Sequence, residues 1–496
     1  MTKKTLQIMI IVGLVGVLLT TLIMGTSYWH DEIILTDISK QPITQLMDTI
    51  STEPHPPGIY LFLKLFPVEY PLLTRILFIS MSTIALALAI AWADKNKVLE
   101  KYNLYFGLAL FAVSPLWTSI APNVKQDAVT LPLFIIAFFV LLKFQENLEY
   151  KYLIALTLFA IIALFFGYLN FVYIAILLCI ATIQKITFKR FLPLFFAGII
   201  FMAYVLLFGA RQYINNNHRL DWQNYREPTI VSLVYSAVSW TTIGTDHFSD
   251  ICFILMGFAF SALLLLEKKT VYQKTMLLFL LFGFLAGIID NVIVRNRYFA
   301  PFSFMFILLC GQGMESLIHH FNIKSKYLIP IILVVASLNG ILAHITSNKA
   351  HLNYAKESQF VSQLAGPEPT GVLYRSSVSG YVRKIGFYPN NTNAIPINPF
   401  IKTQNTDKTI TSTILAIEGN TDYLKATLTD VVTSLRNTGL KKFVYLAVDT
   451  IQWGSGDGLY DTNLLTLQGL ESVCEKKNLQ YFKDRFILVF DNCNAQ

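Results

Sequence analysis

Long apolar runs separated by short polar segments dominate the first 345 residues of the chain. A hydrocarbon core of ~30 Å requires about 20 apolar residues per helix, and about eleven runs approach that length. The expected spans are Leu6–Ser27, Pro71–Trp92, Tyr102–Ile120, Ala128–Leu142, Tyr152–Phe166, Tyr168–Ile183, Phe191–Gly209, Ile251–Leu266, Met276–Ile289, Pro301–Ile318 and Tyr327–Ile345. The pattern predicts a polytopic α-helical membrane protein with about eleven transmembrane helices.

Basic residues gather on alternate loops between these runs. The clusters are Lys3/Lys4, Lys95/Lys97/Lys101, Lys143/Lys151, Lys185/Lys189/Arg190, Lys268/Lys269/Lys274 and Lys324/Lys326. All of them fall on one side of the membrane, which the positive-inside rule makes cytoplasmic. We expect a multi-pass protein of the cytoplasmic (inner) membrane whose C-terminal part is periplasmic or extracellular. Because Met1–Tyr28 lacks a clear small-residue cleavage site, we expect it to stay as the first helix.

The predicted outer loops differ from the short basic ones. The first, residues 28–70, is rich in His, Asp, Glu and Pro, and apolar residues recur in it at near-helical spacing. These are Ile38, Leu46, Met47 and Ile50. The spacing indicates an amphipathic helix on the membrane surface. A second long loop, residues 211–250, carries three arginines and two tryptophans, and loops of this length are usually functional.

The composition changes abruptly near Ser347. Strand-like runs alternate with helical patterns, which predicts a small α/β domain over residues 347–496, after a membrane domain over residues 1–346. The expected strands are Val372–Tyr374, Phe443–Val448 and Phe486–Phe490, and the expected helices are Tyr423–Leu435 and Leu464–Lys476. The glycine-rich stretch Gly454–Gly458 lacks a P-loop lysine and is interpreted as a plain loop.

Two of the five cysteines lie in this tail, and we expect them to form a disulfide. Cys474 falls on the second predicted helix and Cys493 follows the last predicted strand. A chain reversal at Lys476–Asn478 would bring them together, and an oxidising compartment would let them pair. The other three cysteines, Cys179, Cys252 and Cys310, lie in apolar runs and are interpreted as small core hydrophobes.

The composition agrees with a membrane protein. Hydrophobic residues make up 54% of the chain and charged residues 14%, whereas soluble domains carry about a quarter. The net charge of +8 is spread over short loops rather than gathered in one patch, so we expect no nucleic-acid partner.

Four polar clusters fall at predicted outer helix ends. They are Asp31-Glu32, Glu53–His55, Lys125–Asp127 and Arg295–Tyr298. Ionisable groups at membrane depth are costly and are candidates for function. A carboxylate can deprotonate an acceptor hydroxyl, while Arg, Lys and His can hold a phosphate as it leaves. Taken singly, each cluster also fits a solvated helix end, a dipole-favoured charge or a headgroup anchor.

The order of these clusters resembles the start of GT-C glycosyltransferases, especially the bacterial members of the protein O-mannosyltransferase and aminoarabinose-transferase group. The resemblance rests on WHDE at 29–32, EPHPPGIYLFL at 53–63 and YPLLTR at 70–75, and continues with Ser114-Pro115, KQD at 125–127 and RYFAP at 297–301. It covers roughly residues 7–345. It implies a GT-C fold and an inverting transfer of a sugar from a polyprenyl-phosphate carrier outside the cytoplasm.

The resemblance also implies roles for individual residues. Asp31 would be the catalytic base, and Glu32 and Glu53 would orient the acceptor or the sugar. His55, Lys125, Asp127, Arg295, Arg297 and Tyr298 would bind the substrate, with His55 and Arg297 near the lipid phosphate. The sequence departs from the pattern at Gly58, where relatives often have Leu, and at Lys125-Gln126, which replaces an arginine-containing stretch.

We expect no certain cofactor, and whether a divalent cation binds near Asp31 and Glu53 is left open by the sequence. The expected partners are a polyprenyl-phosphate sugar, membrane lipids, and an extracytoplasmic glycan, lipid or protein as acceptor. Two alternatives are a lipid-linked glycan transporter and a ligand-sensing membrane receptor. A transporter would place charges along a midplane path and show internal repeats. A receptor would leave the Asp-Glu and Glu-Pro-His-Pro-Pro motifs unexplained.

Overall fold

The computed structural model describes residues 30–50, 56–183, 188–209, 256–265, 270–289, 300–322, 329–342, 370–374, 394–397, 428–447, 467–482 and 485–493, with a few isolated positions besides. The chain divides into two compact units. The first comprises Met1–Thr26 and Leu35–Lys349, and the second Ser27–Ile34 and Ala350–Gln496.

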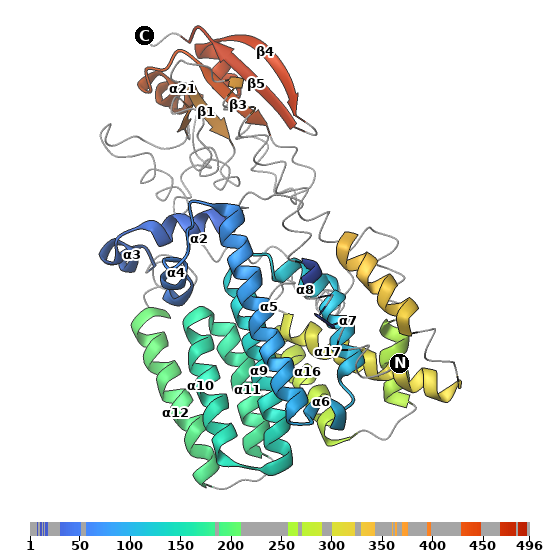
Figure 1. Ribbon diagram of the computed structural model, residues 1–496. Coiled ribbons are helices and arrows are strands. Elements are labelled where there is room, and N and C mark those ends of the chain that lie inside the picture. The colour runs from blue at the N-terminus through green and yellow to red at the C-terminus, as the bar shows by residue number, and fades with distance from the viewer. Residues whose placement is uncertain are drawn as a thin grey trace. The chain divides into compact units, whose positions relative to one another are not determined.

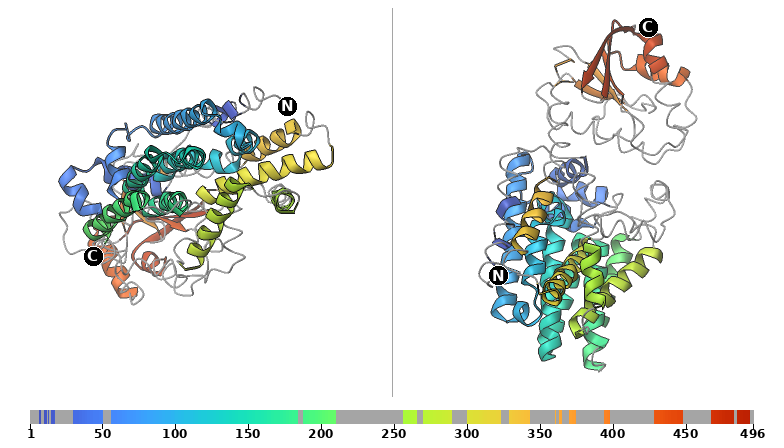
Figure 2. Two further views of the ribbon diagram at one scale, coloured as in Figure 1. Left: turned by 90° about the horizontal axis from the view of Figure 1, so that it is seen from below. Right: turned by 90° about the vertical axis from the view of Figure 1, so that its right-hand side faces the viewer.

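The first unit is helical (Figure 1). Its described elements include α2 (His30–Lys40, which begins in the second unit), α3 (Ile43–Ile50), α4 (Pro57–Leu63), α5 (Pro71–Lys95), α6 (Val98–Lys101), α7 (Tyr105–Val113), α8 (Pro115–Ile120), α9 (Gln126–Asn147), α10 (Tyr150–Phe166), α11 (Tyr168–Ile183), α12 (Phe188–Tyr204), the π-helical turn η1 (Val205–Gly209), α16 (Val271–Ile289) and α17 (Ala300–His320). Helices α9, α10, α11 and α12 stand side by side (Figures 1 and 2).

Several helices are long and apolar enough to cross a membrane. Within the described residues there are four, namely Pro71–Lys95, Gln126–Asn147, Leu192–Gly209 and Ala300–His320. Shorter apolar helices are Tyr150–Phe166, Tyr168–Thr182, Met256–Leu265 and Ile329–Leu342. Each lies within or close to a predicted span, which supports a multi-pass membrane protein.

The predicted span Tyr102–Ile120 is not one continuous helix. It is divided into α7 and α8 at Ser114, which is extended (φ −73°, ψ 155°). Proline at 115 disfavours helical geometry in the residue before it and supplies no N–H donor. The Ser114 hydroxyl then caps α8 by accepting a hydrogen bond from the Trp117 backbone N–H.

Helices α5 and α9 run parallel, which defines the two ends of the bundle. At one end the Arg75 guanidinium donates to the Pro122 carbonyl, and at the other Lys143 donates to the Asn96 carbonyl at 3.2 Å. We call the end where α5 and α9 begin the α8 end, and the opposite one the α6 end, after the short helices found there (Figure 1).

Contacts along α16 and α17 give the direction of both helices. Near the start of α16, the Tyr272 ring lies 4.7 Å from that of Tyr102, at the α6 end. In the second half of α17, the Gln312 side chain donates to the Tyr102 carbonyl at 3.0 Å, so this part of α17 also lies at the α6 end. Helix α16 therefore runs toward the α8 end, and α17 starts there and returns.

Close packing places α4 at the α8 end. A Cβ at Gly58 would lie 2.1 Å from the Phe165 carbonyl oxygen, so α4 touches the α10 backbone near its last turn. The Phe62 ring lies 5.6 Å from Phe166 and 5.9 Å from Phe78. Only glycine at 58 permits this approach, which gives a physical reason for the departure from the family pattern.

The amphipathic helix expected around Ile38–Ile50 is two helices. Helix α2 ends at Lys40 and α3 begins at Ile43, since Pro42 interrupts the chain between them. In α3, Leu46 and Ile50 are buried, while Ile43 is 63% exposed and Met47 36% exposed. Placement of this helix on the membrane surface stays a prediction.

Within the part of the second unit that the structure describes, five strands form a mixed sheet. Its strands are β1 (Thr370–Tyr374), β2 (Ala394–Ile397), β3 (Phe443–Ala447), β4 (Glu475–Phe482) and β5 (Arg485–Asp491), in the order β2-β1-β3-β5-β4. Strand β1 is parallel to β2 and β3, and β5 is antiparallel to β3 and β4. Helix α21 (Leu428–Asn437) and a short helix at 467–473 accompany it. The boundary of the expected α/β domain at residue 347 stays a prediction.

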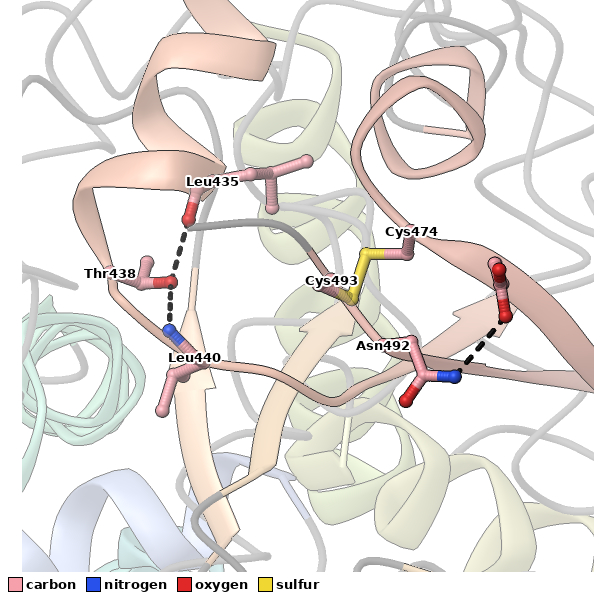
Figure 3. Close-up of a disulfide and its surroundings, with 7 residues drawn as sticks. Leu435, Thr438, Leu440, Cys474, Asn492 and Cys493 are labelled. Carbon is pink, nitrogen blue, oxygen red and sulfur yellow. Dashed lines mark hydrogen bonds between the residues drawn. A yellow bond between two sulfur atoms is a disulfide. The ribbon is translucent and has the colours of Figure 1, made fainter. Parts of the chain in front are cut away.

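The predicted disulfide between Cys474 and Cys493 is present, with their Cα atoms 3.9 Å apart (Figure 3). The route between the cysteines was predicted wrongly. The helix ends before Cys474, and Lys476–Asn478 lie in β4 rather than in a reversal. The disulfide instead joins the start of β4 to the end of β5, beside an Asn492–Glu475 hydrogen bond of 3.2 Å.

Candidate functional site at the α8 end of the bundle

Buried polar side chains gather at the α8 end. They come from the first half of α5, from α8 and its cap, from the start of α9 and from helix Ile329–Leu342. The residues are Thr74, Arg75, Ser82, Ser114, Thr118, Lys125, Gln126, Thr130 and Asn339. Burying polar groups in an apolar bundle costs free energy, so such a concentration indicates a site that uses them.

Lys125 and Asp127 flank the first residue of α9. Lys125 is the N-cap of the helix, with extended backbone (φ −142°, ψ 167°), and is only 2% exposed. Asp127 lies in the first turn, where the helix dipole favours a carboxylate. The structure thus places both predicted substrate-binding residues at the α8 end, with Gln126 buried between them.

Arg75 is a buried residue of this end to which the sequence motif gave no role. It is 1% exposed, and its Nη1 donates to the Pro122 carbonyl at 2.7 Å. A cation inside an otherwise apolar predicted span was the available signal, because lysine and arginine are seldom fully buried unless they are paired.

Two further predicted clusters lie outside the described residues. The described helices next to them, α4, α16 and α17, each have one terminus at the α8 end. Glu53 and His55 precede Pro56 and Pro57, at the start of α4. Arg295, Arg297 and Tyr298 lie between Ile289, the last residue of α16, and Ala300, the first of α17. Substrate binding by these residues stays a prediction.

Asp31 and Glu32 lie in the first turn of α2, within the segment Ser27–Ile34 that belongs to the second unit. Glu32 is fully buried. For Asp31 the described part of the chain includes the backbone but not the side chain. Its role as a base stays a prediction.

Among the described residues, no group of three or more His, Cys, Asp and Glu side chains could hold a metal ion. Glu53 and the Asp31 side chain are not among those residues. The possible divalent cation therefore stays a prediction.

Comparisons with known proteins bear on the fold. No protein-family model matches the chain, and no curated protein matches it by sequence. Among solved structures, ArnT (aminoarabinose transferase) from Cupriavidus metallidurans bound to undecaprenyl phosphate is similar over 98% of both chains, with a TM-score of 0.60 and 11% identity.

ArnT in the apo state covers 96% of this chain and 97% of its own, with a TM-score of 0.57 and 10% identity. The arabinofuranosyltransferase AftD from Mycobacteria aligns over all of this chain and 40% of its own, with a TM-score of 0.45. The expected resemblance is confirmed at the level of fold: from the helical bundle through the α/β domain, this chain has the fold of the GT-C membrane glycosyltransferase ArnT.

Proposed function

We propose that this chain is a membrane-embedded glycosyltransferase that moves a sugar from a polyprenyl-phosphate carrier to an extracytoplasmic acceptor, with inversion at the anomeric carbon. The observation that carries the proposal is the similarity over 98% of both chains to ArnT bound to undecaprenyl phosphate. A shared fold alone does not fix function. The proposal therefore also depends on the residues at the α8 end.

The buried basic residues at the α8 end suit a phosphate-bearing lipid. Lys125 is held at the N-terminus of α9, where backbone N–H groups and the helix dipole also favour an anion. Arg297, as a planar guanidinium, would bind the phosphate bidentately, and Arg295, His55 and Tyr298 would complete its recognition. Neutralising the phosphate stabilises it as the leaving group.

Asp31 would act as general base. Its carboxylate would take the proton of the acceptor hydroxyl as the hydroxyl oxygen attacks the anomeric carbon. The bond from that carbon to the phosphate oxygen then breaks, and the phosphate leaves on the opposite face, which inverts the configuration. Glu32 and Glu53 would orient the reacting groups. The bundle's apolar exterior would accommodate the prenyl chain within the bilayer.

The α8 end would face the periplasm or the cell exterior, with the N-terminus in the cytoplasm. The disulfide supports an extracytoplasmic location for the second unit, because disulfides persist in oxidising compartments.

Purified protein in lipid nanodiscs tests the proposal when it is incubated with a panel of polyprenyl-phosphate monosaccharides and candidate acceptors. Wild-type protein should release free polyprenyl phosphate, and NMR of the product should show an inverted anomeric configuration. Asp31→Asn should fold normally and lose about 10²–10⁴-fold in rate, as expected for loss of a general base. Activity of Asp31→Asn within threefold of wild type would remove Asp31 from this role.

A further inference from the structure

The segment from Pro122 to Ala128, which carries Lys125 and Asp127, is fixed to α5 at both of its ends. At the first end, Arg75 Nη1 donates to the Pro122 carbonyl at 2.7 Å. At the second, Ser82 Oγ donates to the Ala128 carbonyl at 2.7 Å. Both hydrogen bonds are buried, so water competes little with either of them.

The second hydrogen bond has a cause in the sequence of α9. In a regular helix the Ala128 carbonyl would accept from the N–H of residue 132, but residue 132 is proline and has no N–H. This carbonyl would otherwise lack its helical partner in the apolar bundle. The Ser82 hydroxyl supplies the missing donor, which ties the first turn of α9 to α5.

The first hydrogen bond fixes the chain before the helix starts. Pro122 follows the end of α8, and its carbonyl lies outside any helix. The Arg75 guanidinium is charged at all physiological pH values, so its hydrogen bond to this carbonyl is a strong one. Between the two anchored carbonyls, Lys125 and Gln126 are almost completely buried.

We propose that Arg75 and Ser82 are positioning residues for phosphate recognition: they act through the Pro122–Ala128 segment to hold Lys125 in the geometry that engages the lipid phosphate, with Asp127 fixed beside it in the first turn of α9. This inference rests on the proposed function. In this proposal Arg75 acts on the Pro122 carbonyl and contributes to binding through that segment.

The inference is tested by measuring the equilibrium binding of undecaprenyl phosphate to the full chain in nanodiscs, with native mass spectrometry as the detection method. Arg75→Met removes the donor while keeping a side chain of similar length, and should weaken binding about tenfold, the order expected for a hydrogen bond from a charged group. Arg75→Lys should restore most of the affinity, because an ammonium can still donate to one carbonyl. Ser82→Ala should weaken binding about threefold. Because it is a smaller change, it tests the same segment if Arg75→Met does not fold.

Two control variants separate positioning from loss of stability. Lys143→Met removes the cation that donates to the carbonyl of Asn96, the C-cap residue of α5, at the α6 end. Thr157→Val removes a buried hydroxyl that donates to the Leu153 carbonyl within α10. Both should lower the melting temperature as the test variants do, while their affinity for undecaprenyl phosphate stays within twofold of wild type.

A double-mutant cycle with Lys125→Ala completes the test. If Arg75 acts through this segment, Arg75→Met should weaken binding by less than twofold once Lys125 is alanine. Full additivity of the two changes, or an unchanged affinity in both Arg75→Met and Ser82→Ala, would overturn the inference while wild-type binding upholds the proposed function. Absence of binding by wild-type protein would overturn both.

Discussion

At the scale of single residues, the chemistry depends on which cations meet the lipid phosphate. A planar guanidinium presents two N–H groups to a phosphate at once, while lysine acts as a point charge. The proposed site contains both kinds: Lys125 lies at the start of α9, and Arg295 and Arg297 fall in the sequence between α16 and α17. We therefore assign the fixed orientation of the phosphate to an arginine, and its charge neutralisation to the whole group.

Replacing Arg297 by alanine should raise the apparent KM for the polyprenyl-phosphate donor about tenfold or more and leave the KM for the acceptor unchanged. Removing a bidentate, charge-assisted contact costs on this order. Steady-state kinetics with each substrate varied in turn would measure the effect, and Arg297→Lys should recover only part of the loss. A change confined to acceptor dependence would move Arg297 to the acceptor site.

At the scale of elements, close backbone contacts keep the helices of the α8 end in place. Helix α4 approaches α10 at Gly58, and helix Ile329–Leu342 approaches α7 at Gly340, where a Cβ would lie 2.2 Å from the Val113 carbonyl oxygen. Neither position tolerates a side chain without a shift of backbone. Both contacts are with backbone atoms, which cannot move aside as a flexible side chain can.

Substituting leucine for Gly58 should push α4 away from α10 and lower stability by about 1–3 kcal/mol, the usual cost of overpacking. The melting temperature in detergent should fall, and donor affinity should fall with it, because α4 directly follows Glu53 and His55 in the chain. Gly198→Ala in α12 is the matched control, since a Cβ there meets nothing within 4 Å and alanine favours helix. Equal stability of Gly58→Leu and wild type would contradict the close contact.

The disulfide gives a second prediction at this scale. Replacing Cys474 and Cys493 by serine removes a cross-link over a sequence separation of 19 residues, which the chain-entropy model values at about 3 kcal/mol. The α/β domain should then be digested faster by trypsin, with the helical unit left intact. A digestion rate that does not change would show that the hydrophobic core around Phe443 and Phe490 suffices by itself.

The elements also show what the sequence could predict. Long apolar periodicity located α5, α9, α10, α11 and α17 to within a few residues, and β3 and β5 were visible as short apolar runs. The edge strands β2 and β4 were missed for physical reasons. Pro396 in β2 is tolerated only because an edge strand need not donate on both sides, and β4 begins with the polar run Glu475–Asn478.

Side-chain partnerships at the site were harder to foresee. That Ser82 would compensate for Pro132 requires knowing that α5 and α9 run parallel and in contact. The position of Lys125 and Asp127 at the start of a helix could be predicted from the sequence, and Arg75 was visible as a cation in an apolar run. The partners of Arg75 and Ser82 could not be predicted. Such tertiary contacts carry no local sequence signal.

At the scale of the whole molecule, orientation in the membrane decides whether the α8 end can meet an external acceptor. Asn437, an exposed residue at the end of α21, is a suitable labelling site once Cys179, Cys252 and Cys310 are replaced. The disulfide-bonded pair does not react. A cysteine at Asn437 should be labelled by an impermeant maleimide on intact cells, or on spheroplasts where an outer membrane blocks access. Labelling only after lysis would reverse the orientation.

The central claim is that the chain consumes a polyprenyl-phosphate sugar and passes that sugar to a surface acceptor. Mass spectrometry of lipid extracts and surface glycans tests it most directly. The cells compared produce either wild-type protein or Asp31→Asn, at equal levels and with no other copy of the gene. In the variant, one polyprenyl-phosphate monosaccharide should accumulate, and one surface glycan should lose the mass of the same sugar. Identical donor pools and identical glycans in the two strains would contradict the account.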